Sequence, residues 1–222
     1  LIDDLPLTPS LVKEGAHVRT VKKVIVANRL DSEAEYFLKF PADEKWGVWG
    51  ACLGSEDIAG EKKLCAEEIR PTKVGPPFLS PAKAGYFFVV DGLGLQLPLP
   101  GKFMVENALL AIAASRSLGV SMTACKEALE KIQVIPGRLE TIEAGQDFEV
   151  IVDYAHEPRS FEAVLRTGRD LSGSGKLIAV FGATGGGRDK AKRPIMGELA
   201  AKYADYVILT TDDPYNDDPQ EL

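Results

Sequence analysis

The sequence predicts an α/β protein in which an incomplete sheet with helices is followed by a Rossmann-like parallel βαβαβ domain. Three observations support this class. In the second half, short apolar runs alternate with segments of helical periodicity. These runs are apolar almost throughout, which is typical of parallel strands covered by helices on both faces. Polar residues follow each run, at the edge where open parallel sheets bind ligands.

The first half predicts strands and turns that end in two helices. A hairpin is expected around an Asp91-Gly92 turn. The following helix should stop at Gly119, and the next should begin at a Ser121 cap. In chain order, we expect these elements at 22–28, 46–51, 85–100 (the hairpin), 103–119 and 121–132.

A Pro-Gly break in IPGRLE (135–140) predicts a domain boundary, with one domain over 1–136 and a second, incomplete one over 137–222. Pro158 suits the first turn of a helix. The second domain should consist of a strand, a helix, a strand, a helix and a strand, at 148–154, 158–171, 176–182, 191–204 and 205–213. Its parallel strands should bring their polar carboxyl ends to one edge.

Bulk composition limits the classes of partner. The 222 residues are 45% hydrophobic and 27% charged, as in ordinary soluble domains. A net charge of −7 argues against nucleic acid, and no apolar run approaches the ~18–20 residues of a membrane span. The three cysteines are odd in number and far apart, so reduced thiols in a cytoplasmic protein are expected. Two histidines cannot build a His-rich metal site alone.

The stretch VFGATGGGRDKAKRP (180–194) raises the question of a nucleotide site. It lacks both the GK[ST] ending of a P-loop and the G-x-G-x-x-G of a dinucleotide fingerprint. The turn could hold an anion with its backbone amides, or simply connect a strand to a helix. The density of positive charge behind it favours a carboxylate or phosphate ligand, and Arg188 suits bidentate recognition. Lys190 is better explained as a solvated side chain.

Acidic residues follow the neighbouring strands. Asp153 ends one strand, and spacing alone leaves two roles open: accepting ribose hydroxyls, or bracing a turn. His156 could touch a phosphate or fill a polar corner. The stretch TTDDPYNDDP (210–219) could receive an ammonium group or a cation, although turn formation explains Asp217 and Asp218 well.

Five motifs, taken in order over about residues 85–219, resemble the Mur ligases, and most closely the branch that adds the third amino acid to UDP-N-acetylmuramoyl-dipeptide in peptidoglycan synthesis. GKFMVENALLAIAAS is similar to the family's G-x-F-N-V-x-N-A-x-A-A helix, and PGRLE to its G-R-x-E. VDYAHEP is similar to D-Y-A-H-T-P. FGATGGGRDKAKRPIMG is similar to F-G-x-G-G-x-R-D-x-x-K-R-P-x-M-G, and TTDDPYNDDP to T-x-D-N-P-R-x-E-D-P.

The resemblance implies ATP-dependent amide formation, with ATP and Mg²⁺ as cofactors and with UDP-N-acetylmuramoyl-peptide and an amino acid as substrates. It also implies a cytoplasmic monomer. Asn107 would lie near the adenine, and the other ATP contacts would be Arg138, Asp153, Tyr154 and His156. The amino acid would be held by Arg188, Asp212, Asp213 and Tyr215.

Several positions depart from the family's pattern. The glycine turn is one residue longer, Met104 stands in place of an Asn, and Asp213 in place of another Asn. Glu157 replaces a Thr near the phosphates, where a carboxylate would repel ATP unless a cation offsets it. Tyr215 replaces an Arg that, in diaminopimelate-adding members, grips the side-chain carboxylate, and a phenol cannot form that fork. The departures therefore predict a lysine-like substrate without a distal carboxylate.

The resemblance also implies that the P-loop, magnesium ligands and UDP-binding domain lie upstream, so the 222 residues alone are expected to be inactive. Residues 1–20 match no part of the family. Three alternatives stay open. They are a folylpolyglutamate synthase-like ligase, an NAD(P)-binding short-chain reductase suggested by VFGATGG, and a non-catalytic module derived from a ligase.

Overall fold

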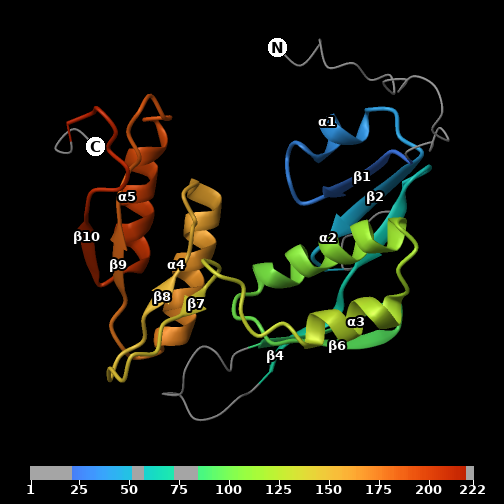
Figure 1. Cartoon of the computed structure of the whole chain (residues 1–222), viewed down its shortest axis with the longest axis horizontal. Helices are drawn as coiled ribbons and strands as arrows, with labels where there is room; N and C mark the ends of the chain where they lie inside the picture. The colour runs from blue at the N-terminus through green and yellow to red at the C-terminus, as the bar shows by residue number, and fades with distance from the viewer. Residues whose placement is uncertain (1–21, 52–57, 73–84, 219–222) are drawn as a thin grey trace, which may run out of the picture.

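The computed structural model describes residues 22–51, 58–72 and 85–218, which form two adjoining halves (Figure 1). In the first half, three parallel strands pair in the order β1-β2-β3, and three antiparallel strands pair in the order β4-β5-β6. The parallel strands are β1 (Val24–Asn28), β2 (Glu44–Trp49) and β3 (Lys62–Cys65). The antiparallel strands are β4 (Glu67–Thr72), β5 (Gly85–Val90) and β6 (Leu93–Leu97).

Three helices belong to this half: α1 (Ala34–Leu38), α2 (Phe103–Ser117) and α3 (Met122–Glu130). The helix α2 contributes residues such as Leu109 and Ile112 to a core that it shares with both sheets. The predicted strands, hairpin and two long helices are confirmed. The strands β3 and β4 and the short helix α1 were not predicted, because their sequences carry no clear periodicity over enough residues.

The predicted turn and helix ends are confirmed by backbone geometry and a capping hydrogen bond. Asp91 and Gly92 have φ of 50° and 74°, as the two central residues of a type I′ hairpin turn require. Gly119 has φ of 88° just after α2. The Ser121 hydroxyl accepts a hydrogen bond from the Ala124 amide at 3.2 Å and so caps α3.

The second half has the predicted order of elements, with a two-residue hairpin strand added before it. The elements are β7 (Glu140–Thr141), β8 (Ile151–Val152), α4 (Pro158–Ser172), β9 (Ile178–Phe181), α5 (Lys192–Tyr203) and β10 (Tyr206–Leu209). β9 and β10 pair in parallel. The α/β class is thereby confirmed.

Two details of the predicted parallel sheet are wrong for the described residues. β8 is hydrogen-bonded in antiparallel fashion to β7, and not to β9, because the turn at 142–150 folds the chain back on itself. Helices also cover only one face of the β9–β10 pair. Phe161, Leu165, Met196 and Ala200 pack with Ala179, whereas Val180, which points to the opposite face, is 62% exposed.

The thiol prediction needs one correction. Cys125 is free and buried, as expected. Cys65 is disulfide-bonded, so reading every cysteine as a reduced thiol was wrong. Sequence spacing gave no sign of this, because a disulfide depends on the distance between folded segments. Among the described residues, no helix combines the length and apolar character needed to cross a membrane.

Side chains of the second half contact the first half at Arg159 and at Leu139. Arg159, in the first turn of α4, donates hydrogen bonds to the Asp31 carboxylate at 3.0 Å and to the Leu30 carbonyl at 3.3 Å. Leu139 is only 3% exposed, and its side chain lies against Gly101. The carboxyl end of β1 and the start of α4 are therefore side by side.

An ion pair at the amino ends of β9 and β10 predicts that the stability of the fold is sensitive to acid. The Arg169 guanidinium and the Leu177 amide both donate to the Asp205 carboxylate, and this lowers the pKa of Asp205 to about 2. Because this pKa lies below that of an unfolded aspartate, about 3.9, the carboxylate stabilises the fold above that pH and loses its effect as pH falls towards 2. We expect the stability difference between wild type and Asp205→Asn to be constant above about pH 5 and to shrink between pH 4 and 2. Urea unfolding across this range measures it, and a difference that stays constant down to pH 2 would contradict the assignment.

Candidate functional site

The glycine stretch lies directly against the loop that follows β10. A Cβ on Gly182 would fall well inside contact distance of the Thr210 carbonyl oxygen and 2.9 Å from the Asp212 Cβ. A Cβ on Gly185 would overlap the Pro214 carbonyl oxygen. Both glycines are therefore required by the close approach of two backbones, and the stretch shapes this loop packing whether or not it also binds an anion.

Hydrogen bonds hold the two loops in register. The Gly185 amide donates to the Asp213 carbonyl at 3.1 Å, and the Gly186 amide donates to the Asp217 carboxylate at 3.2 Å. The Thr184 hydroxyl donates to the Asp212 carboxylate at 3.4 Å. Asp217 is thus a loop-bracing residue, which agrees with the turn-forming role that explained it best.

The Tyr215 ring covers the glycine turn. A Cβ on Gly186, where φ is +68°, would lie 2.9 Å from the Tyr215 ring. Asp213 and Tyr215 have positive φ themselves, 39° and 52°. Positive φ is uncommon outside glycine, and residues in such strained backbone conformations are often found at functional sites. Tyr215 remains 65% exposed, so its ring is accessible to a ligand.

Asp153 braces a turn. Its two carboxylate oxygens accept hydrogen bonds from the Leu139 and Ala155 amides, each at 2.8 Å. Leu139 has a positive φ of 46°, so the bond supports an unusual backbone conformation. Of the two roles open for Asp153, the turn role is therefore present in this structure, while a ribose contact stays a prediction.

The segments PGRLE and DYAH form one surface. The Tyr154 amide donates to the Gly137 carbonyl at 2.9 Å. The Tyr154 ring lies over Gly137, where φ is +67° and any Cβ would collide with the ring. Tyr154 is 69% exposed, and Arg138 and His156 are exposed on the same segments. The structure thus brings three of the predicted ATP contacts to one accessible region.

A cation offsets the carboxylate of Glu157. The Lys192 ammonium donates to Glu157 Oε1 at 2.6 Å, and His156 Nε2 lies 3.8 Å from the same oxygen. This pair links the start of α4 to the start of α5. From the sequence, Lys192 was one of several cations behind the glycine turn, and a solvated side chain was the alternative to a role in binding. The sequence feature that pointed to a cation here was Glu157 itself, because a carboxylate near the expected phosphates requires a compensating positive charge.

Asn107 lies on α2 in the other half. It is exposed, and its amide contacts the Met104 sulfur at 3.7 Å. Met104 itself is 3% exposed and belongs to the core, so this departure from the family's pattern places an apolar side chain where it is buried. Within the described part of the chain, Asn107 makes no hydrogen bond to the loops described above.

The residues predicted to hold the amino acid lie on two neighbouring loops. Asp212, Asp213 and Tyr215 lie on one loop that packs against 182–187, and Arg188 follows directly and is exposed. Hydrogen bonding thus connects the loops at the carboxyl ends of β9 and β10, and the Glu157–Lys192 ion pair connects the start of α4 to the start of α5. No group of three metal-ligating side chains occurs in the described ranges, so no residue there is assigned to Mg²⁺.

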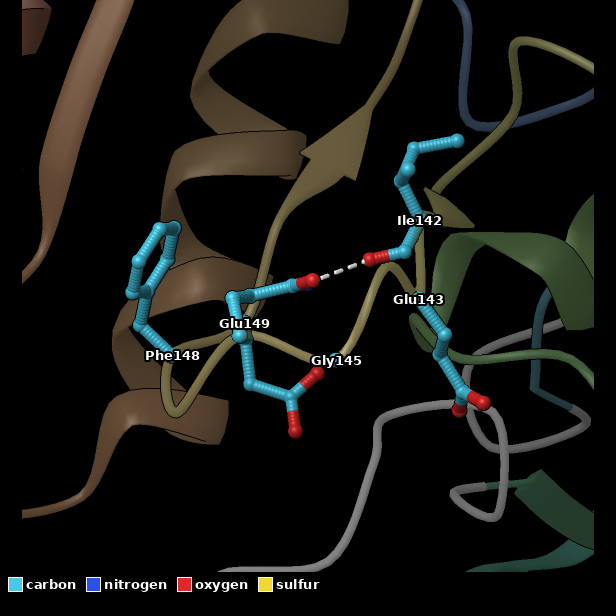
Figure 2. Close-up of a pocket in the computed structure, with 6 residues that line it drawn as sticks. Ile142, Glu143, Gly145, Phe148 and Glu149 are labelled. Carbon is cyan, nitrogen blue, oxygen red and sulfur yellow. Dashed lines mark hydrogen bonds between the residues drawn. The ribbon is translucent and has the colours of Figure 1, made fainter.

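A separate hollow lies in the turn between β7 and β8 (Figure 2). The Gln146 side chain donates to the Ile142 carbonyl at 2.6 Å. The hollow is lined by Ile142, Glu143, Gly145, Gln146, Phe148 and Glu149. Burial and then the charge of Glu143 raise the pKa of Glu149. Two acidic side chains in one hollow disfavour an anionic nucleotide, and none of the predicted site residues lies there.

Residues 137–222 match the protein family described as "Mur ligase, glutamate ligase domain". A UDP-N-acetylmuramoyl-L-alanyl-D-glutamate–2,6-diaminopimelate ligase of Syntrophomonas wolfei is 45% identical over 132 residues, covering 60% of this chain and 27% of that protein. A Geobacillus kaustophilus protein with the same name is 34% identical over 200 residues, covering 90% of this chain and 38% of that protein.

Among solved structures, an Acinetobacter baumannii UDP-N-acetylmuramoylalanyl-D-glutamyl-2,6-diaminopimelate–D-alanyl-D-alanyl ligase matches with a TM-score of 0.57 at 22% identity. The match covers 86% of this chain and 39% of that one. At this sequence identity, it shows that the two folds are similar. The present chain spans well under half of the length of each of these relatives. The resemblance drawn from the five motifs is confirmed.

Proposed function

We propose that this chain, a Mur ligase homologue over residues 137–222, is part of an ATP-dependent ligase that adds an amino acid to UDP-N-acetylmuramoyl-dipeptide in peptidoglycan synthesis. One observation carries the proposal. Thr184–Asp212 joins the loops after β9 and β10, and Glu157–Lys192 joins the start of α4 to the start of α5, so the motif residues of these segments are linked to one another. A cytoplasmic monomer is proposed with it.

The residues of this chain would act by positioning and charge neutralisation, which dominate phosphoryl and acyl transfer. The exposed Tyr154 ring offers a surface on which a base or ribose can lie, beside Arg138 and His156, which suit phosphate oxygens. Asn107 would approach the adenine from the first half. When bound, ATP supplies the phosphoryl group that activates the substrate carboxylate, and Mg²⁺ neutralises charge.

The amino acid would bind at the glycine turn. Arg188 can hold its α-carboxylate in a bidentate fork, while Asp212 and Asp213 can receive an ammonium group. Tyr215 lies beside them in place of a cation. We therefore propose a lysine-like amino acid. The Syntrophomonas wolfei and Geobacillus kaustophilus relatives are named as diaminopimelate ligases, which makes diaminopimelate the competing substrate.

The test is an amide-forming assay with the complete gene product, ATP, the UDP-N-acetylmuramoyl-dipeptide and either amino acid. We expect amide product with a higher kcat/KM for lysine than for diaminopimelate. The variant Tyr215→Arg should shift this preference towards diaminopimelate by about tenfold or more, because a charge-assisted pair contributes roughly 1.5–3 kcal/mol. A wild-type preference for diaminopimelate would refute the lysine-like assignment.

The alternatives give different results in the same experiments. Product with a folate and glutamate, but not with the muramoyl dipeptide, would indicate a folylpolyglutamate synthase-like enzyme. Nicotinamide-cofactor binding without amide formation would indicate the reductase. Absence of all these activities in the complete product would favour a binding module.

A further inference from the structure

We propose that Lys192 is a positioning residue whose task is to neutralise the Glu157 carboxylate at the phosphate side of the site. This inference rests on the proposed function. It concerns the one departure from the family's pattern that places a negative charge where an anionic substrate is expected. The resulting Glu157–Lys192 pair would replace the uncharged side chain that the pattern has at residue 157.

The backbone of Glu157 fixes where its carboxylate can lie. Glu157 is the N-cap of α4 in extended conformation, with φ −113° and ψ 146°, and its carbonyl accepts bonds from the Phe161 amide and the Ser160 hydroxyl. Its side chain makes no capping bond to the helix. The carboxylate instead turns to Lys192 and lies beside His156.

Lys192 occupies a position where a carboxylate partner is favourable. It is the first residue of α5, where the helix dipole disfavours a positive charge. Its side chain is only 19% exposed, so water solvates the ammonium incompletely. The nearby carboxylate compensates both effects. The Lys192 ammonium is therefore committed to Glu157 and is not a free phosphate ligand.

Removing the ammonium should expose the site to a net negative charge. The repulsion between two unit charges a few ångströms apart at a protein surface is large enough for about a tenfold change in affinity. Lys192→Met should raise the KM for ATP about tenfold in the complete enzyme, with a smaller effect on kcat. Adding Glu157→Gln to that variant should restore most of the loss, because the uncompensated charge disappears.

The chain offers a matched control. Lys202 also joins α5 to α4, through a 3.3 Å contact with Glu162, but it lies near the opposite end of α5. Lys202→Met removes the same charge from the same pair of helices. It should leave the KM for ATP within about twofold of wild type, because the distant charge is screened.

The decisive experiment is steady-state kinetics on wild type, Lys192→Met, Glu157→Gln and the double variant, with thermal melting to verify folding. Rescue by Glu157→Gln supports the proposal. A double variant as impaired as Lys192→Met would overturn it, since Lys192 would then contact the nucleotide itself. An unchanged KM in folded Lys192→Met would overturn it equally.

If Lys192→Met fails to fold, Glu157→Gln alone decides. It should leave the KM for ATP unchanged or lower, because it frees a cation, and a raised KM would overturn the proposal. Failure of the proposed function is recognised separately, since wild type would then form no amide product with any amino acid.

Discussion

Gly182→Ala should reduce ligase turnover of the complete enzyme by more than about 100-fold. The added Cβ would collide with the Thr210 carbonyl and the Asp212 side chain, neither of which can rotate away cheaply. The loop carrying Asp212 and Tyr215 must therefore move relative to the glycine turn. Displacements near 1 Å at substrate-positioning residues can cost about 100-fold in rate, and overpacking of this kind costs about 1–3 kcal/mol of stability.

The matched control is Gly197→Ala. Gly197 lies inside α5 on an exposed surface, and a Cβ there would meet no atom within 4 Å. Alanine should stabilise this helix by about 0.5–1 kcal/mol and leave turnover unchanged. Urea unfolding and the amide-forming assay measure both variants. Wild-type turnover in Gly182→Ala would show that the contact between the two loops does not shape the site.

Leu109→Ala should lower the free energy of unfolding by about 2–5 kcal/mol. Leu109 is fully buried in α2, within the core that this helix shares with the parallel and antiparallel sheets. Alanine leaves a cavity because residues on both sheets hold the surrounding walls in place. Since Asn107 lies on the same helix, the KM for ATP should also rise if Asn107 approaches the adenine.

Leu118→Ala is the control for this change. Leu118 ends the same helix but is 80% exposed, so its truncation should change stability by less than about 0.5 kcal/mol. Urea unfolding of both variants gives the comparison. Equal effects of the two substitutions would contradict the placement of Leu109 in the core.

Much of the fold could be predicted because it depends on local patterns. The Asp91-Gly92 turn, the Ser121 cap and the position of Pro158 each follow from the conformational preference of one or two residues. The helices at 103–117 and 158–172 are long enough for their periodicity to exceed noise. The order of motifs was likewise sufficient to indicate the family.

Strand pairing and the hydrogen-bond partners of side chains could not be predicted in this way. The same apolar run at 148–154 is compatible with a parallel neighbour or with a hairpin, and only the folded chain decides in favour of β7. An aspartate that braces a turn and an aspartate that binds ribose look identical in sequence. In the folded chain, the Asp153 carboxylate accepts hydrogen bonds from the Leu139 and Ala155 amides. The disulfide of Cys65 was missed for the same reason.

By itself, the sequence determined the α/β class, the chain order of the main elements and the resemblance to the Mur ligases. Only the tertiary structure decided that Gly182 and Gly185 serve backbone contact with the next loop and that Lys192 pairs with Glu157. The physical reason is range. Turn and helix preferences act over a few neighbouring residues, whereas excluded volume and charge pairing depend on distances between segments about 30 residues apart in the chain.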